Sequence, residues 1–355
     1  MKIATVVGAR PQFIKAAAGS RQLRKNHKEV LIHTGQHYDR EMSEIFFREL
    51  GIPNPDYNLG ISGGTHSQMT AKMLPALEEV FNMVKPDMVL VYGDTNSTLA
   101  AALTAVKMHI PVAHVEAGNR LGDLNNPEDV NRILTDHCST QLFCASQNAM
   151  DNLENENLVS RAVLVGNIMY DVFLYYAEKP WTKKEIFDLE GHIVSIPECY
   201  YYMTCHREEN TGSDEPLTQI LRAMNSLDAQ TIYPVHPRNR KRAIQLKNKF
   251  HFSNVIMTKP VKYTDSIQLV RHAKKVVTDS GGLQCEAFFA GVQCVTIFKR
   301  KVWPETMTGC RNQLADANTN NILHKLSAKQ VIDPRYQPFG DGHASEKIAN
   351  HIGKN

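Results

Sequence analysis

The chain has 355 residues, which is long for one domain and comfortable for two. Hydrophobic residues make up 42% and charged residues 22%, as in ordinary globular proteins, and 40 basic against 37 acidic residues leave a formal charge of +3. This balance gives no reason to expect a nucleic acid or a membrane surface as a partner. Seven cysteines form no Cys-x-x-Cys pair, and the first residues contain no apolar signal segment, so we expect a cytoplasmic protein with free thiols.

Strands and helices are predicted to alternate through the first half of the chain. The apolar, β-branched runs that predict strands are 2–7, 29–33, 88–92, 112–115 and 141–144, and the helical patterns are about 10–25, 65–83, 95–108 and 128–137. Thr65 is expected to cap its helix. Strands that alternate with helices form right-handed βαβ units, so the sheet should be mainly parallel.

A less regular stretch, about 170–198, is expected to link two domains. Alternation then resumes, with predicted strands at 200–204, 231–235, 255–257, 275–278 and 294–297 and helices at 217–226 and 281–290. We therefore predict an α/β fold with two Rossmann-like, doubly wound domains, 1–170 and 171–335. A C-terminal helical segment, 336–355, could pack back on the first domain. Open sheets of this kind bind ligands beyond the carboxyl ends of their strands, so a cleft between the domains is the expected ligand site.

The loop Gly8-Ala9-Arg10-Pro11 follows the first strand. It is not a Gly-x-Gly-x-x-Gly sequence, so a dinucleotide cofactor is not indicated. Arg10 and Lys15 are cations near a helix N-terminus, where phosphate oxygens are stabilised. A plain βα turn with solvated basic residues explains this loop equally well.

Three carboxylates follow neighbouring elements of the first half. Asp94 comes after the strand 88–92, although capping of the next helix is the commoner role at such a position. Glu116 ends an apolar strand, where an acid is costly unless it is paired or used. Glu128 lies in a first helical turn, where acids often only complement the helix dipole. Taken together, the three suggest acid–base chemistry, because like charges crowded in one cleft raise one another's pKa.

The second half carries basic and glycine-rich strand ends. His206 follows a strand beside Arg207 and Glu208, with Asn210 close behind, which is compatible with proton transfer or phosphate binding as well as with an ordinary structural or exposed histidine. His236 and Arg238 repeat the pattern after the next strand.

Ser280, Gly281 and Gly282 open a helix after the strand 275–278, and such glycines let a backbone approach phosphate closely. Glu286 lies one turn further on, within reach of a ribose diol.

A metal site is not predicted. His33, Gln36, His37 and Asp39 lie close in sequence, but they fall on a strand and a loop, and their spacing matches no standard zinc pattern.

Taken in order, these motifs resemble the non-hydrolysing UDP-N-acetylglucosamine 2-epimerases. The sequence as a whole is more similar to a subgroup of this family that acts on UDP-2,3-diacetamido-2,3-dideoxy-glucuronate. The segments that carry the resemblance are 7–15, 33–39, 92–95, 114–118, 127–132, 206–210 and 279–282, and together they span nearly the whole chain. The resemblance implies a glycosyltransferase-B-like fold, a homodimer, a UDP-sugar substrate, and neither a nicotinamide cofactor nor a metal.

The resemblance also implies a mechanism. A base removes the proton at carbon 2 of the sugar, UDP leaves from carbon 1, and UDP then adds back to the 2-acetamidoglucal with a proton delivered to the other face. Asp94, Glu116 and Glu128 would be the acid–base groups, with His206 assisting at the diphosphate. The residues matched to substrate or UDP binding are Arg10, Lys15, Arg132, Arg207, Asn210, His236, Arg238, Ser280, Gly281, Gly282, Glu286 and Glu305.

The chain departs from the family pattern in two loops. Asn119 and Asp129 stand where Leu and Glu are usual, and Lys301-Val302-Trp303-Pro304-Glu305 lacks a usual arginine. Asp123 and the absence of an additional arginine in the loop 119–129 disfavour a uronate, whose carboxylate would want a bidentate cation. We therefore expect UDP-N-acetylglucosamine as substrate. The alternatives are the diacetamido uronate, a hydrolysing epimerase that releases UDP, a retaining glycosyltransferase and a non-catalytic UDP-sugar sensor.

Overall fold

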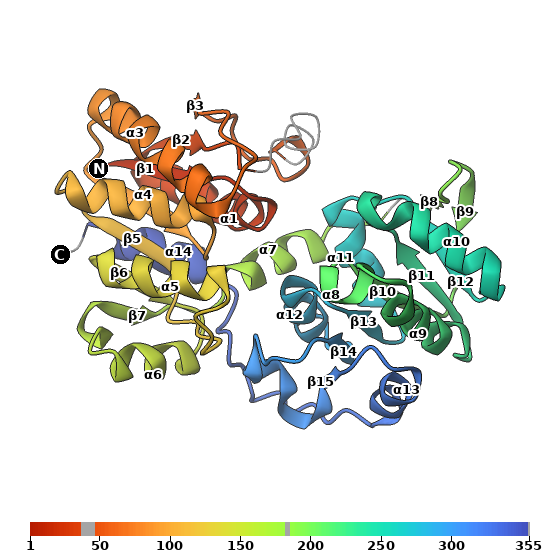
Figure 1. Cartoon of the computed structure of the whole chain (residues 1–355). Coiled ribbons are helices and arrows are strands. Elements are labelled where there is room, and N and C mark those ends of the chain that lie inside the picture. The colour runs from red at the N-terminus through yellow and green to blue at the C-terminus, as the bar shows by residue number, and fades with distance from the viewer. Residues whose placement is uncertain (37–46, 182–184, 354–355) are drawn as a thin grey trace. The chain divides into compact units, whose positions relative to one another are not determined.

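The computed structural model describes residues 1–36, 47–181 and 185–353. The chain divides into two compact units, each of which contains its own parallel sheet (Figure 1). The first unit comprises Met1–Val172 together with Gln337–Asn355, and the second comprises Phe173–Tyr336. The predicted α/β fold with two Rossmann-like domains is confirmed.

The first unit contains a seven-stranded sheet in the order β3-β2-β1-β4-β5-β6-β7, with every neighbouring pair parallel. Its strands are β1 (Lys2–Val7), β2 (Lys28–His33), β3 (Tyr57–Asn58), β4 (Met88–Tyr92), β5 (Val112–Ala117), β6 (Gln141–Cys144) and β7 (Ala162–Leu164). Its helices include α1 (Arg10–Asn26), α3 (His66–Val84), α4 (Asn96–Lys107), α5 (Pro127–Cys138), α6 (Gln147–Asn155) and α14 (Ala344–His351). All residues of β4 are buried, as expected for a strand covered on both faces.

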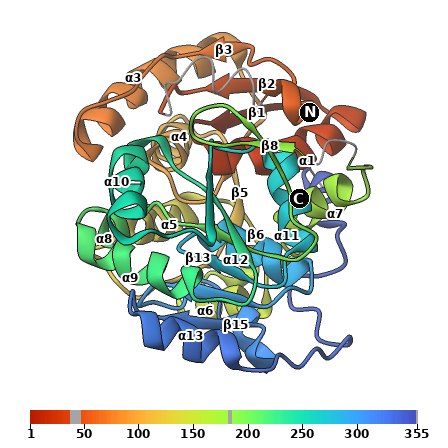
Figure 2. The same ribbon diagram turned by 90° about the vertical axis from the view of Figure 1, so that its right-hand side faces the viewer.

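Helices α3 and α4 lie side by side and share one hydrophobic core with β1 and β2 (Figure 1 and Figure 2). Thr65 caps α3 as predicted, with its hydroxyl accepting the Gln68 N–H (3.2 Å). Thr95, rather than Asp94, caps α4, so the ordinary capping explanation for Asp94 is wrong. The Asp94 carboxylate is therefore left for another contact.

The second unit contains a six-stranded parallel sheet in the order β12-β11-β10-β13-β14-β15. Its strands are β10 (Tyr200–Thr204), β11 (Gln230–Pro234), β12 (Val255–Thr258), β13 (Val276–Thr278), β14 (Cys294–Ile297) and β15 (Asn312–Ala315). Its helices include α8 (Glu208–Thr211), α9 (Asp214–Asn225), α10 (Arg240–Phe250), α11 (Tyr263–His272), α12 (Gly281–Phe289) and α13 (Thr319–Ser327). Helices α9 and α13 lie next to each other (Figure 2).

The stretch 170–198 is more regular than the sequence suggested. It contains most of α7 (Ile168–Ala177) and an antiparallel hairpin of β8 (Glu185–Phe187) and β9 (Ile193–Ser195). The hairpin turn is held by Asp188, whose carboxylate accepts the N–H groups of Glu190 (2.9 Å) and Gly191 (2.7 Å). Such short strands give too weak an alternation to be recognised from sequence.

The C-terminal helix α14 belongs to the first unit and packs against α1. The Asp171 carboxylate caps it from a distant part of the chain, by accepting the N–H groups of Ala344 (3.0 Å) and Ser345 (2.7 Å). Burial raises the pKa of Asp171, which these hydrogen bonds partly offset. Among the described residues, no helix is both long and apolar enough to cross a bilayer.

Candidate functional site

The predicted site residues fall into two groups, one in each unit, and both lie where the strand order of a sheet reverses. In the first unit the reversal is between β1 and β4, and in the second it is between β10 and β13. Strands on either side of this point send their following loops in opposite directions, which opens a crevice at their carboxyl ends. The two groups are described separately.

Glu116 in the first unit is buried, and its carboxylate forms an ion pair with the Lys15 ammonium. Only 8% and 9% of the Lys15 and Glu116 side chains are exposed, so water screens their attraction little. Glu116 also has a left-handed φ of 75°, at a register shift between β5 and β6. A glutamate in this region is strained, and such strain is typical of functional sites.

Asp94 forms a second ion pair, with the Arg132 guanidinium from α5. Burial lowers the pKa of Arg132, but the carboxylates of Asp94, Glu116 and Asp129 together raise it above its usual range. Arg132 therefore lies within electrostatic reach of all three acids. The structure brings Asp94 and Glu116 together around this cation.

Two of the three acids have cationic partners that sequence order does not show. Asp94 forms an ion pair with Arg132, and Glu116 forms one with Lys15. Glu128 lies in the first turn of α5 and is exposed, with its N–H bound by the Asn126 cap (2.9 Å). Sequence order alone could not show that two cations separate these charges.

Lys15, predicted as a phosphate contact, is the partner of Glu116 and so also belongs to the carboxylate group. Arg10 is the first residue of α1 and is partly exposed. Gln12, a buried residue in the first turn of α1, fixes this loop. Its carbonyl oxygen accepts the N–H groups of Gly8 (2.8 Å) and Ala9 (3.0 Å), and its amide donates to the Tyr92 carbonyl (2.9 Å).

Asp129, one of the departures from the family pattern, shapes the loop that precedes α5. Its buried carboxylate accepts the N–H groups of Leu121 (2.9 Å) and Asp123 (3.1 Å) and lies 3.4 Å from Arg132. The same acid therefore holds the loop backbone and the cation that pairs with Asp94.

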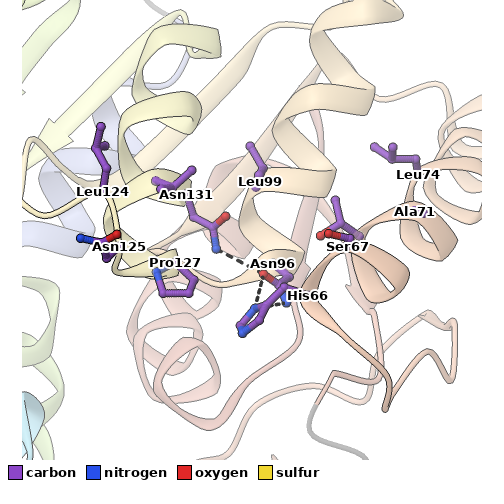
Figure 3. A pocket seen from close by; sticks show the side chains of 12 residues that line it. His66, Ser67, Ala71, Leu74, Asn96, Leu99, Leu124, Asn125, Pro127 and Asn131 are labelled. Atoms are coloured by element: carbon purple, nitrogen blue, oxygen red, sulfur yellow. Dashed lines mark hydrogen bonds between the residues drawn. The ribbon is translucent and has the colours of Figure 1, made fainter.

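A cavity of about 560 Å³ lies among α3, α4 and α5 (Figure 3). His66, Asn96 and Asn131 line it, and Figure 3 shows the hydrogen bonds that join them. Asn131 also donates to the Asp94 carbonyl (2.9 Å). The cavity wall and the backbone of Asp94 are thus held by one side chain.

In the second unit, both the side chain and the backbone N–H of His206 contact the Asp279 carboxylate. The Asp279 carboxylate is buried and lies 3.0 Å from His206 Nδ1, and it accepts the backbone N–H groups of His206 (2.9 Å) and Arg207 (2.8 Å). Burial alone would raise the pKa of Asp279, but the His206 side chain and these N–H groups lower it to about 2. An ionised Asp279 fixes Nδ1 of His206 as a donor, which leaves Nε2 for a ligand.

His236 and Arg238 join His206. The two imidazole rings stack with centroids 6.3 Å apart, and an Arg238 Nη donates to the His206 carbonyl (3.2 Å). Arg207 donates to the Asp279 carbonyl (2.7 Å) and lies over the Phe298 ring.

The predicted ligand contact Asn210 serves as internal support. It is buried and donates to Asp279 (3.2 Å) and to the Ile297 carbonyl (3.1 Å).

At the N-terminus of α12, there is space beside Gly282 for a ligand to contact the protein backbone. A Cβ at Gly282 would have its nearest neighbour, Ser280 Oγ, 3.8 Å away, so this face has room. Ser280 caps the helix by accepting the Leu283 N–H (3.4 Å). Gly281 lies closer to the Val302–Trp303 segment, with a Cβ position 3.4 Å from Val302. Free N–H groups and the helix dipole at such an end favour anions.

Glu286 lies one turn into α12 and is buried. Burial raises its pKa to about 7. Glu305 is also buried, and its carbonyl accepts the Tyr336 hydroxyl (3.1 Å). Both carboxylates are thus in the second unit with Ser280 and Gly282.

Two of the residues considered above as metal ligands, His37 and Asp39, lie outside the described ranges. His33 is buried, and its Nδ1 accepts the Gly35 N–H (2.7 Å). Within the described residues, one group with metal-like spacing is Asp188, Glu190 and His192, in the hairpin turn. It is largely exposed and lies in a surface turn, so we assign it no role.

Two doubly wound parallel sheets with charged groups at both reversal points have the architecture of Rossmann-type nucleotide-binding enzymes. The sequence profile of the UDP-N-acetylglucosamine 2-epimerase family matches residues 21–353. The chain therefore belongs to the UDP-N-acetylglucosamine 2-epimerase family, whose members are isomerases.

Similarity to known proteins extends over nearly the full chain. A UDP-N-acetylglucosamine 2-epimerase homolog of Methanococcus maripaludis is 46% identical, with 98% of each chain covered. The UDP-2,3-diacetamido-2,3-dideoxy-D-glucuronate 2-epimerase of Pseudomonas aeruginosa is 43% identical over all of both chains. Among solved structures, the Methanocaldococcus jannaschii UDP-GlcNAc 2-epimerase in complex with UDP-GlcNAc and UDP has a TM-score of 0.85, with 36% identity and 99% of each chain covered.

Proposed function

We propose that this chain interconverts UDP-N-acetylglucosamine and UDP-N-acetylmannosamine without net hydrolysis. The observation that carries the proposal is the pair of strand-end carboxylates, Asp94 and Glu116, each of which forms an ion pair with a cation, Arg132 and Lys15 respectively. The family and the UDP-GlcNAc complex of a relative support the choice of substrate.

The proposed chemistry uses the two groups for different tasks. A carboxylate of the first unit takes the proton from carbon 2, while the bond from carbon 1 to UDP breaks and UDP keeps the electron pair. Return of a proton to the opposite face of carbon 2, with UDP adding back at carbon 1, gives the epimer. Asp94, Glu116 and Glu128 are the proposed acid–base residues, and a base so placed gains from proximity.

The second unit is proposed to bind UDP. His206, with Nδ1 fixed by Asp279, can donate from Nε2 to the leaving diphosphate. Arg207, His236 and Arg238 add nearby positive or donor groups.

The open α12 N-terminus at Ser280–Gly282 suits a phosphate, and Glu286 suits a ribose diol. Arg10, Arg132 and Glu305 are proposed to assist binding, and Asn210 to support the site from within.

Exchange in heavy water tests this proposal. The protein is incubated with UDP-N-acetylglucosamine, and deuterium at carbon 2 and free UDP are followed together. Deuterated, intact UDP-sugars of both configurations are expected. Stoichiometric free UDP would instead identify a hydrolysing epimerase, and binding without exchange would identify a sensor.

A second candidate substrate is UDP-2,3-diacetamido-2,3-dideoxy-glucuronate, because the Pseudomonas relative of that name is 43% identical over the whole chain. The same exchange assay with both UDP-sugars compares them directly. We expect faster exchange with UDP-N-acetylglucosamine. Faster exchange with the uronate would replace the substrate and keep the reaction.

We also propose a cytoplasmic homodimer that serves polysaccharide biosynthesis, as the resemblance implies. Light scattering on the eluting protein should give twice the 40.0 kDa chain mass. A mass of one chain at micromolar concentration would contradict the dimer.

A further inference from the structure

His114 lies on β5, two residues before Glu116, and is fully buried. Its Nδ1 lies 2.6 Å from Asp136 Oδ1, and its Nε2 lies 2.7 Å from the Gly93 carbonyl oxygen. A carbonyl oxygen only accepts hydrogen bonds, and an ionised carboxylate does the same. Burial would raise the pKa of Asp136, but His114 and Arg120 lower it below its usual value, so it is ionised. Both ring nitrogens of His114 therefore donate.

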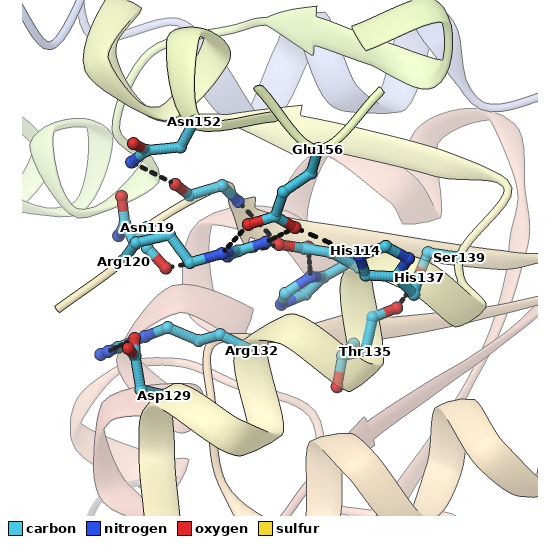
Figure 4. A network of polar contacts seen from close by, with 12 residues as sticks. His114, Asn119, Arg120, Asp129, Arg132, Thr135, His137, Ser139, Asn152 and Glu156 are labelled. Carbon is cyan, nitrogen blue, oxygen red and sulfur yellow. Dashed lines mark hydrogen bonds and ion pairs between the residues drawn. The ribbon is translucent and has the colours of Figure 1, made fainter. Parts of the chain in front are cut away.

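Asp136 is itself fixed by a chain of polar contacts, and Figure 4 shows the outer part of this chain, from Arg120 to Glu156. Its second oxygen accepts the Gly118 N–H (3.0 Å) and pairs with Arg120 (2.8 Å). Arg120 in turn makes two hydrogen bonds to Glu156, of 2.7 and 2.8 Å. The anchor of His114 thus cannot shift without disturbing Gly118, Arg120 and Glu156.

The two contacts of His114 end beside the proposed acid–base residues. Gly93 directly precedes Asp94 and has a left-handed φ of 64°. On the other strand, Glu116 has a φ of 75°, and the N–H of Gly118 just beyond it is held by Asp136. One imidazole therefore joins the backbone turn that carries Asp94 to the strand that carries Glu116.

We propose that His114 is a positioning residue for the epimerisation, which fixes Asp94 relative to Glu116 through the Gly93 carbonyl. This inference rests on the proposed function of the two carboxylates. A buried ionic network gives little net stability, so placement of neighbouring groups is a better explanation for it. Displacement of a base by about 1 Å can cost on the order of 100-fold in rate.

Two substitutions separate the two contacts of His114. In His114→Asn, the amide nitrogen can replace Nδ1 and keep Asp136, but the side chain is too short for Gly93. In His114→Gln, the amide can replace Nε2 and keep the Gly93 carbonyl. Glu156→Gln is the matched control, because it weakens the outer end of the same network and leaves both His114 contacts in place.

The measurements are kcat and KM for epimerisation, carbon-2 exchange, and UDP binding by calorimetry. We expect His114→Asn to lower kcat about 50-fold, with KM and the UDP Kd within about threefold, because only the transition-state geometry changes. His114→Gln should recover kcat to within about fivefold of wild type, and Glu156→Gln should retain it. Unchanged kcat in His114→Asn, or equal losses in the Asn and Gln variants, would overturn the proposal.

The wild-type assay keeps the two proposals apart. Wild-type protein that shows no exchange contradicts the proposed function, whereas active wild type with an active His114→Asn variant contradicts only the role of His114. If the His114 variants do not fold, the proposal is tested on the wild-type protein, by nitrogen-15 spectra of labelled histidine that report the protonation of both ring nitrogens. Two protonated ring nitrogens at His114 support the assignment, and a ring with one bare nitrogen overturns it.

Discussion

Replacement of Asp279 by asparagine tests how the second unit holds His206. The wild-type carboxylate is 1% exposed and receives hydrogen bonds from backbone His206 and Arg207 and from the Asn210 amide. An asparagine has the same shape but carries no charge. Its NH₂ group would replace one carboxylate oxygen, so a donor would face the N–H groups that now donate to Asp279. Asp279→Asn therefore removes the acceptor that organises this strand end.

The size of the effect follows from the pKa of Asp279. Its value falls from 3.8 to about 2 on folding. One pKa unit corresponds to about 1.4 kcal/mol, so the ionised carboxylate stabilises the fold by about 2.5 kcal/mol. Because the folded pKa is the lower one, this contribution is complete above the unfolded value of 3.8 and is lost as the pH falls through about 2.

Urea unfolding measures the effect. At neutral pH, Asp279→Asn should lower the free energy of unfolding by about 2.5 kcal/mol, with the difference constant above about pH 5 and shrinking below about pH 4. Turnover should fall as well, because His206 loses its orienting partner. The control is Asp214→Asn, which breaks an exposed pair with Arg242 and should have a much smaller effect on stability.

Two results would refute this reasoning. An Asp279→Asn variant as stable as wild type at pH 7 would show that the carboxylate does not stabilise the fold. A stability difference that grows as the pH falls from 5 to 3 would have the wrong sign for an acid with a lowered pKa.

Three further predictions concern other acids and their partners. Lys15→Met should lower the free energy of unfolding by about 3 kcal/mol, because the buried Glu116 carboxylate loses its cation; a variant that unfolds at the wild-type urea concentration would contradict the ion pair. Glu286 has a pKa raised to about 7 by burial, so its contribution to stability is complete below 4.5 and is lost as the pH rises through 7, and UDP affinity should rise over the same interval if the ionised form binds ribose. Calorimetry should show that Glu286→Gln removes the pH dependence of UDP affinity, and a retained dependence would assign it elsewhere. Asp94→Asn, Glu116→Gln and Glu128→Gln should each lower turnover about 100-fold or more, with the UDP Kd nearly unchanged; near-normal turnover in all three would exclude them as acid–base groups.

The parts of the fold that were predictable are those encoded by local patterns. The strands that precede Asp94 and His206, and the strand that contains Glu116, are short apolar runs followed by polar loops, so both the alternation and the loop positions can be read from neighbouring residues. The short hairpin β8–β9 and the cap of α14 by Asp171 were missed, because the first has little periodicity and the second joins residues 173 positions apart.

The partners within the site were not predictable for the same reason. The ion pair of Lys15 with Glu116 joins α1 to β5, and that of Asp94 with Arg132 joins a loop to α5. Sequence patterns identify the acids but contain no information on which cation folds against each. Asp136 was overlooked, and Asp129 was noted only as a departure from the family pattern, because acids within helices usually face solvent, whereas these two are fully buried.

The return of residues 337–355 to the first unit has a consequence for biosynthesis. A ribosome makes 1–172 first, then all of 173–336, and only afterwards the helix α14 that packs on α1. The nascent first unit therefore stays incomplete during this time. The side of α1 that contacts α14 is uncovered, and Asp171 lacks the N–H groups that it later caps. The inserted second unit, whose residues are contiguous, can complete its sheet earlier, so the unit that begins the chain is the later of the two to mature.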